Sequence, residues 1–152
     1  MRPLRMSART YARDTMPSAH ASPSRQDLDT VEAASTVLLV FFRIAQAWSL
    51  SPTEQAILLG VNQATCDAWR DERVDSSLPG DTLERLGYIL NIYSALQTAL
   101  PVQARADAWV RAPNRAAMFG GEPALKRMLS GQVADLKAVA DYLAGAHSGD
   151  FA

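Results

Sequence analysis

The chain has 152 residues, a formal net charge of -1 and 48% hydrophobic residues, ordinary values for a globular protein with one or two small cores. Near neutrality excludes a protein whose whole surface binds nucleic acid or a membrane through charge. The single cysteine excludes an internal disulfide, and no apolar run reaches the roughly 20 residues of a membrane span, so we expect a cytoplasmic protein.

The first 27 residues differ in composition from the rest of the chain. Up to Gln26 they contain five arginines against one acid, Asp14, and Ser, Ala and Pro fill most of the remaining positions. Such a segment cannot bury enough apolar surface to order itself, so we expect residues 1–27 to form a disordered basic tail. A basic arm that adds affinity for DNA and a transit peptide have a similar composition, and both stay open as alternatives.

From Asp29 onward the apolar residues recur at helical spacing, and no alternating strand pattern of useful length occurs. Residues 31–48 carry a wide apolar stripe, which predicts a first helix buried on more than one face. Asp29 or Thr30 is placed to cap it. The sequence therefore predicts an all-α fold.

Residues 51–72, SPTEQAILLGVNQATCDAWRDE, have the spacing of two short helices joined by a tight turn. Ser51 is the expected N-cap of the first helix, with Glu54 as its capping-box partner. Gly60 ends that helix in a left-handed turn, and Asn62 caps the second helix. The pattern resembles the Xre-type helix-turn-helix, whose second helix enters the DNA major groove.

Residues on the outer side of that second helix are the candidates for contact with DNA. Glutamine can bond a base edge, and arginine can bond a guanine or a phosphate. The predicted DNA-binding residues are Gln63, Thr65, Arg70 and Arg73. Four acids of the same unit, Glu54, Asp67, Asp71 and Glu72, outnumber its two arginines and oppose phosphate binding. A helical scaffold that binds DNA weakly or not at all is therefore the alternative.

The second half of the chain continues with helical patterns. Asp81 is placed to cap a long helix that extends to Leu100, where Pro101 interrupts it. Another helix is predicted over residues 102–110, and a final one places an apolar face along residues 133–143.

Between those two helices lies the stretch RAPNRAAMFGGEPALKRMLSG, residues 111–131. Its first turn is predicted to cap a short helical segment, RAAMF, and its second proline to start another helix. Two adjacent glycines allow the chain to reverse between these segments. The turn residues are Pro113, Asn114, Gly120, Gly121, Pro123 and Gly131.

The order of residues in this half resembles the Xre/MbcA/ParS family of type II antitoxins, with ParS the most similar. The matching features are Arg85, Leu86, Tyr93, Trp109, Pro113, Asn114, Phe119, Gly120, Gly121, Pro123, Leu129 and Gly131. The resemblance covers the chain from about Thr30 to Gly145 and leaves the basic tail outside it.

The resemblance implies a helix-turn-helix domain over residues 28–100 and a toxin-binding domain over residues 101–152. It implies that the partner is a RES-domain toxin, which degrades NAD or uses it for ADP-ribosylation, and that the antitoxin covers the toxin's active-site cleft. Members of the family form homodimers and larger complexes with toxin, and often repress their own operon. The competing hypothesis is a stand-alone transcription regulator with a helical dimerisation domain.

Residues 111–131 and the chain end supply the candidate toxin contacts. They are Asn114, Arg115, Met118, Phe119, Gly120, Gly121, Lys126, Arg127 and Phe151. Phe119 is alternatively a core residue, and the three cations alternatively no more than solvated charges. The C-terminal Phe151 would bind by entering the toxin's cleft, with fraying of the chain end as the alternative.

No group of residues in the sequence has the arrangement of a catalytic site. His20 and His147 lie in the tails without neighbouring ligands, and Cys66 is placed to pack between two helices as an inert thiol. The double glycine lacks the surrounding motif of a phosphate-binding loop. We therefore expect no enzymatic activity, no cofactor and no metal.

Overall fold

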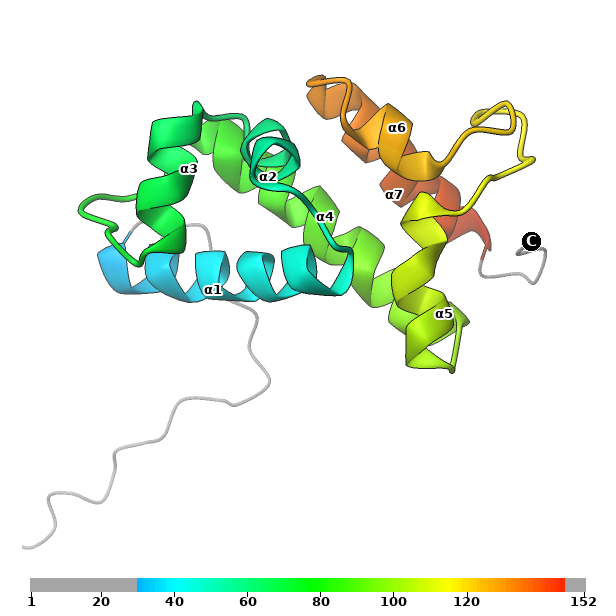
Figure 1. Ribbon diagram of the computed structural model, residues 1–152, viewed down its shortest axis with the longest axis horizontal. Helices are drawn as coiled ribbons and strands as arrows, with labels where there is room; N and C mark the ends of the chain where they lie inside the picture. The colour runs from blue at the N-terminus through cyan, green and yellow to red at the C-terminus, as the bar shows by residue number, and fades with distance from the viewer. Residues whose placement is uncertain (1–29, 147–152) are drawn as a thin grey trace, which may run out of the picture.

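The computed structural model describes residues 30–146, and within that range it is built from helices (Figure 1). The predicted all-α class is confirmed. In chain order the elements are α1 (Val31–Ala47), α2 (Pro52–Leu59), α3 (Gln63–Arg70), α4 (Gly80–Ala99), α5 (Gln103–Ala108), the 3-10 helix η3 (Trp109–Arg111), α6 (Ala124–Met128) and α7 (Val133–Gly145).

Local capping signals set the helix boundaries at the start of the fold, as predicted. The Thr30 side chain accepts a hydrogen bond in the first turn of α1. Ser51 and Glu54 form both halves of a capping box on α2, with donor–acceptor distances of 3.1 and 2.9 Å. Gly60 ends α2 with φ 72°, and Asn62 caps α3. The α2–α3 pair is therefore the predicted helix-turn-helix.

Two boundary predictions in the second half are wrong. Asp81 does not cap α4; that helix begins one residue earlier, after Pro79, and the Asp81 carboxylate accepts from Arg85 instead. The segment RAAMF is not helical but a series of turns. Asn114 closes those turns, because its carbonyl oxygen accepts a hydrogen bond from the backbone of Gly121 at 2.8 Å.

Helix α4 is the element that both halves of the fold share. Helices α1 and α2 pack on one part of it and carry α3, whereas α5 and α7 pack on the other part and α6 packs on α7 and η3 (Figure 1). Helix α7 runs beside α4 in the same direction, since Gly131 lies against Arg85 while Thr98 and Ala144 line one groove further along. Helices α1, α4 and α7 supply much of the core. Their buried side chains include Leu38, Phe41, Leu86, Ile89, Ile92, Leu96, Leu136, Val139 and Leu143.

Arg85 joins the two halves from inside the fold. Its residue is 9% exposed, its Nε donates to Asp81 Oδ2 at 2.7 Å, and its Nη2 donates to the carbonyl oxygen of Gly131 at 2.8 Å. Gly60 makes room for this arrangement, because a Cβ built there would lie 2.5 Å from Arg85 Nε. The turn of the helix-turn-helix and the turn before α7 therefore meet at one guanidinium.

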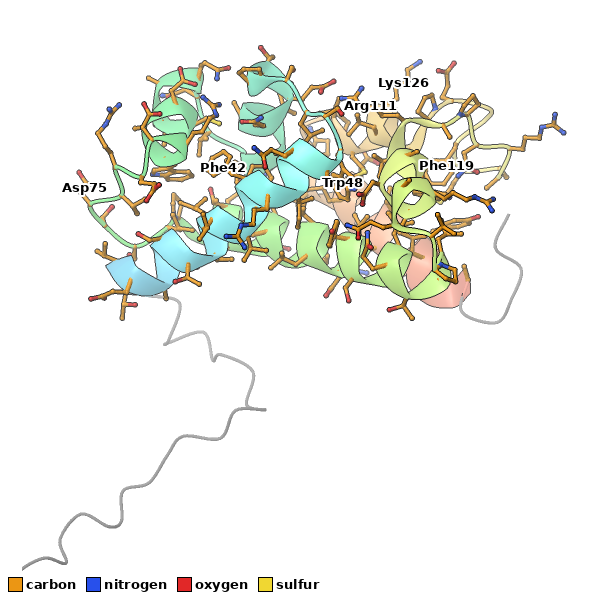
Figure 2. All side chains as sticks on the ribbon, turned by 60° about the horizontal axis from the view of Figure 1, so that its bottom comes forward. Phe42, Trp48, Asp75, Arg111, Phe119 and Lys126 are labelled. Atoms are coloured by element: carbon orange, nitrogen blue, oxygen red, sulfur yellow. The ribbon has the colours of Figure 1, made fainter. Side chains whose placement is uncertain are left out.

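Arg111 makes a second connection at the surface. Its Nε donates to the carbonyl oxygen of Trp48 and its Nη2 to that of Ser49, both at 2.8 Å. Nη2 also lies 2.7 Å from Glu54 Oε1, the oxygen that caps α2. Figure 2 shows Arg111 close to the end of α1 that carries Trp48. This contact ties η3 to the α1–α2 turn.

We expect the substitution Gly60→Ala to lower the free energy of unfolding by about 2–4 kcal/mol, because it adds left-handed backbone strain to a clash with Arg85. The control is Gly87→Ala, in mid-α4, where an added Cβ has no atom within 4 Å; it should raise that free energy by about 0.5–1 kcal/mol. Urea denaturation followed by circular dichroism measures both. Equal effects of the two variants would contradict the close approach at Gly60.

We expect Arg111→Ala to destabilise the fold by about 1–2 kcal/mol, since it removes three charge-assisted contacts from a group that solvent partly screens. Arg111→Lys should restore little of this, because an ammonium lacks the guanidinium fork. Arg115→Ala, at an exposed position, is the matched control and should change stability by less than about 0.5 kcal/mol. Thermal melts of the three variants test the expectation.

Candidate binding surfaces

The loop between η3 and α6 is held in a fixed shape by its own polar groups. The side chain of Asn114 accepts from the backbone of Ala116 at 3.0 Å, and its carbonyl oxygen accepts from Gly121. Pro113 and Pro123 face each other in an isolated antiparallel bridge. Asn114 is 7% exposed, so its observed contacts are those that shape the loop.

An aromatic cluster fixes the same loop to the core. Phe119 packs edge-on against Trp109 and Tyr142, with ring centroids 6.0 and 5.4 Å away. Such edge-to-face pairs add about 0.5–1.5 kcal/mol each beyond the area they bury. Phe119 is 6% exposed. Of the two roles considered for Phe119, the structure has the core role.

Five other predicted toxin contacts lie in the loop before α6 and on α6 itself, and we call this set the α6 face. It consists of Arg115, Met118, Gly120, Gly121 and Lys126. Met118 is half-buried, and the other four are exposed.

Hollows of about 290 and 280 Å³ flank Lys126, which lines both together with Pro123. Arg111 lines the second hollow, and Figure 2 shows Arg111 and Lys126 on the same side of the molecule. Each hollow is also lined by one acid, Glu122 in the first and Glu54 in the second, so the surface around Lys126 combines cations, single acids and shallow apolar depressions.

Arg127 contributes to the fold beneath this face. Its Nε donates to Asp135 Oδ1 at 2.8 Å and its Nη1 to the carbonyl oxygen of Met118 at 3.3 Å. Hydrogen bonds from Ser130 and Arg127 lower the pKa of the Asp135 carboxyl. Arg127 thus connects the loop to the start of α7.

On the helix-turn-helix, the predicted DNA-reading side chains are engaged with their neighbours. Gln63 Nε2 donates to Asp67 Oδ1 at 2.9 Å, and Arg70 Nη1 donates to the same oxygen at 2.8 Å. Arg70 was predicted to point outward, but its guanidinium packs 5.7 Å from the ring centroid of Phe42 and bonds Gln55. Its long side chain folds back over α1 and α2 because both offer it partners.

The other two predicted DNA contacts have fewer constraints. Thr65 is half-buried, and its backbone amide is used by the Asn62 cap. Arg73 is exposed and lies 3.7 Å from Asp71.

Residues 31–100 as a whole contain eight acidic and four basic side chains, whereas residues 101–146 contain four acidic and six basic ones. The electrostatic contrast between the two halves is therefore opposite to that expected of a DNA-binding N-terminal half.

Cys66 is fully buried between α3 and its neighbours. Burial raises the pKa of its thiol, which Arg70 approaches at 3.4 Å. A protonated, inaccessible thiol fits the predicted packing role.

Within residues 30–146, no three His, Cys, Asp or Glu side chains are grouped so that they could hold a metal ion. In the same range no helix is long and apolar enough to cross a membrane.

The sequence patterns do not indicate the roles of Arg111, which lines a hollow beside Lys126, and of Gln55, which accepts a hydrogen bond from Arg70. Both act on groups outside their own helices, and the Arg111–Glu54 pair spans 57 positions, so no local spacing indicates it. The basic tail and Phe151 lie outside the described residues, and their predicted roles stay predictions.

Comparison with known proteins places both halves in one family. The model described as the antitoxin Xre-like helix-turn-helix domain matches residues 27–91, and that of the antitoxin Xre/MbcA/ParS C-terminal toxin-binding domain matches residues 95–149. An uncharacterized protein, y4oB, from Sinorhizobium fredii (strain NBRC 101917 / NGR234) is 42% identical over 130 residues, which cover 85% of this chain and 95% of the relative. Both matched models describe antitoxin domains, which suggest a regulatory protein. The chain belongs to the Xre/MbcA/ParS family of antitoxins.

Proposed function

We propose that this antitoxin neutralises a RES-domain toxin that consumes NAD, by degrading it or by ADP-ribosylation, and that it does so by covering the toxin's active-site cleft. The matched toxin-binding domain supports a toxin as the partner. The observation that carries the proposal is the α6 face, an exposed surface with two cations, Arg115 and Lys126. Lys126 lies 3.7 Å from Glu122 in an exposed ion pair, which solvent weakens, so an acidic partner can compete for it. Charge complementarity of this kind speeds association and fixes orientation.

We further propose how the chain is divided. Residues 1–27 form a basic tail, residues 28–100 a helix-turn-helix domain that includes α4, and residues 101–152 the toxin-binding domain with Phe151 at its end. A homodimer, and larger assemblies with toxin, complete the proposal. Support for a dimer contact comes from α1, where Leu39 and Val40 are 48% and 40% exposed.

The same protein is proposed to bind DNA upstream of its own gene and repress it, through α3 and with help from the basic tail. Of the predicted contacts on or just beyond α3, Gln63 and Arg73 are exposed and Thr65 is half-buried. The tail's arginines would supply the phosphate affinity that the acidic residues of the helix-turn-helix oppose. A stand-alone regulator is the second candidate, favoured only if the adjacent reading frame encodes no RES-like protein.

To test the toxin proposal, we compare Lys126→Glu with Arg105→Glu. Both reverse one exposed charge of the C-terminal half, but Arg105 lies on α5 and outside the α6 face. We expect Lys126→Glu to weaken binding to the toxin of the adjacent reading frame at least about tenfold, since like charges oppose each other at a charged interface. Titration calorimetry and rescue of growth on co-expression measure this.

The control variant should bind the toxin and rescue growth as the unmodified protein does, and both variants should melt at the same temperature. If the two charge reversals act equally, the toxin contact lies elsewhere on the molecule. If the neighbouring protein is not toxic, or if co-expression does not relieve its toxicity, the proposal that this antitoxin neutralises that protein is wrong.

To test the DNA proposal, we delete residues 1–27 and titrate the duplex that lies immediately upstream of the gene. We expect weaker binding and a shallower salt dependence, because each lost phosphate contact reduces the slope of log K against log salt by about 0.9. Fluorescence polarisation at several salt concentrations measures both quantities. An unchanged slope would show that the tail makes no phosphate contacts, and absence of binding by the full chain at low salt would favour the scaffold alternative.

A further inference from the structure

We propose that Asp67 is a specificity-determining residue of the helix-turn-helix, which holds Gln63 and Arg70 in contacts within the chain and so limits the access of α3 to DNA. The inference rests on the proposed DNA binding and adds to it the residue that regulates it. Its basis is a set of four side chains that we call the Asp67 network: Gln55, Gln63, Asp67 and Arg70.

One carboxylate oxygen is the centre of this network. Asp67 Oδ1 accepts from Gln63 Nε2 at 2.9 Å and from Arg70 Nη1 at 2.8 Å. Gln63 stands four residues before Asp67 and Arg70 three residues after it, so helical geometry brings all three to the same side of α3. Two of the four predicted DNA contacts are thereby occupied by a single acid.

Gln63 and Arg70 also form hydrogen bonds with residues of α2. Gln63 Nε2 lies 3.3 Å from the carbonyl oxygen of Pro52 at the start of α2. Arg70 Nε donates to Gln55 Oε1 at 3.0 Å, and the Gln55 amide donates in turn to the carbonyl oxygen of Leu50. The network therefore extends from the second helix of the motif to the turn before its first helix.

The chemistry of these contacts opposes base reading in two ways. Gln63 can make the bidentate contact of glutamine with adenine only if its Nε2 leaves Asp67 and Pro52, and that exchange costs two hydrogen bonds. Asp67 is 48% exposed, so its charge also faces any phosphate that approaches α3. Removal of the carboxylate relieves both effects, whereas removal of a neighbouring acid outside the network relieves only the second.

Glu72 provides that matched control. It is exposed just after α3, and among residues 30–146 its carboxylate forms no hydrogen bond or ion pair. The variants Asp67→Ala and Glu72→Ala thus remove one negative charge each from the same end of the motif. They differ in whether they release Gln63 and Arg70.

The experiment titrates the upstream duplex with the full chain and with both variants, by fluorescence polarisation at fixed salt. We expect Asp67→Ala to bind about tenfold more tightly than Glu72→Ala, the scale of one restored base contact. The excess should disappear in the double variant Gln63→Ala/Asp67→Ala. An unrelated duplex of equal length should show a smaller gain, because a base contact depends on sequence.

Each other outcome is assigned in advance. Equal gains from Asp67→Ala and Glu72→Ala overturn the inference and leave only a general charge effect, while DNA binding itself stands. Absence of DNA binding by the full chain and by every variant overturns both the DNA proposal and this inference. If Asp67→Ala does not fold, the isosteric pair Asp67→Asn and Glu72→Gln replaces it, with the same ranking expected at a smaller ratio.

Discussion

The arrangement of the whole chain depends on where the guanidinium of Arg85 finds its partners. It is nearly buried, so its charge needs close acceptors, and it has two: Asp81 on its own helix and the carbonyl oxygen before α7. The second acceptor fixes the register of α7 along α4. The space for the side chain exists because Gly60 has none of its own. One buried cation thus positions the end of α2 and the start of α7 at once.

The two surfaces proposed to bind toxin and DNA belong to different halves of this arrangement. The α6 face stays exposed because the loop beneath it is closed by Asn114 and anchored by Phe119, and its only ion pair among the described residues is the exposed one between Lys126 and Glu122. On the helix-turn-helix, by contrast, the polar side chains of α3 bond to each other, because Gln63 and Arg70 both donate to Asp67. On the proposed functions, the cations assigned to toxin binding on the α6 face lie exposed, whereas Gln63 and Arg70, assigned to DNA binding, would first exchange partners.

How much of this the sequence predicts depends on the distance over which each signal acts. The capping box of Ser51 and Glu54 spans three residues, so its pattern alone places the start of α2. The turns of RAAMF were mistaken for a helix because their closure is set by Asn114 and Gly121, seven positions apart, against good local helix propensity. The prediction that Arg70 points outward is wrong, because the direction of a long side chain depends on its partners as well as on its position on the helix. Arg111 was missed because its acceptors lie about sixty positions away.

The contact at Glu54 has a consequence for how freely the halves of such proteins can be exchanged. The Arg85 connection uses a backbone carbonyl, which any C-terminal half with the same turn would supply. The Arg111 connection uses the side chain of Glu54, whose one oxygen also caps α2. A chimera that joins this toxin-binding half to another helix-turn-helix keeps the first connection only if the recipient carries an arginine at the position of Arg85, because the toxin-binding half supplies only the carbonyl oxygen. The contact between Arg111 and a carboxylate also needs an acid three residues after the recipient's N-cap, so a helix cap contributes to the compatibility between halves.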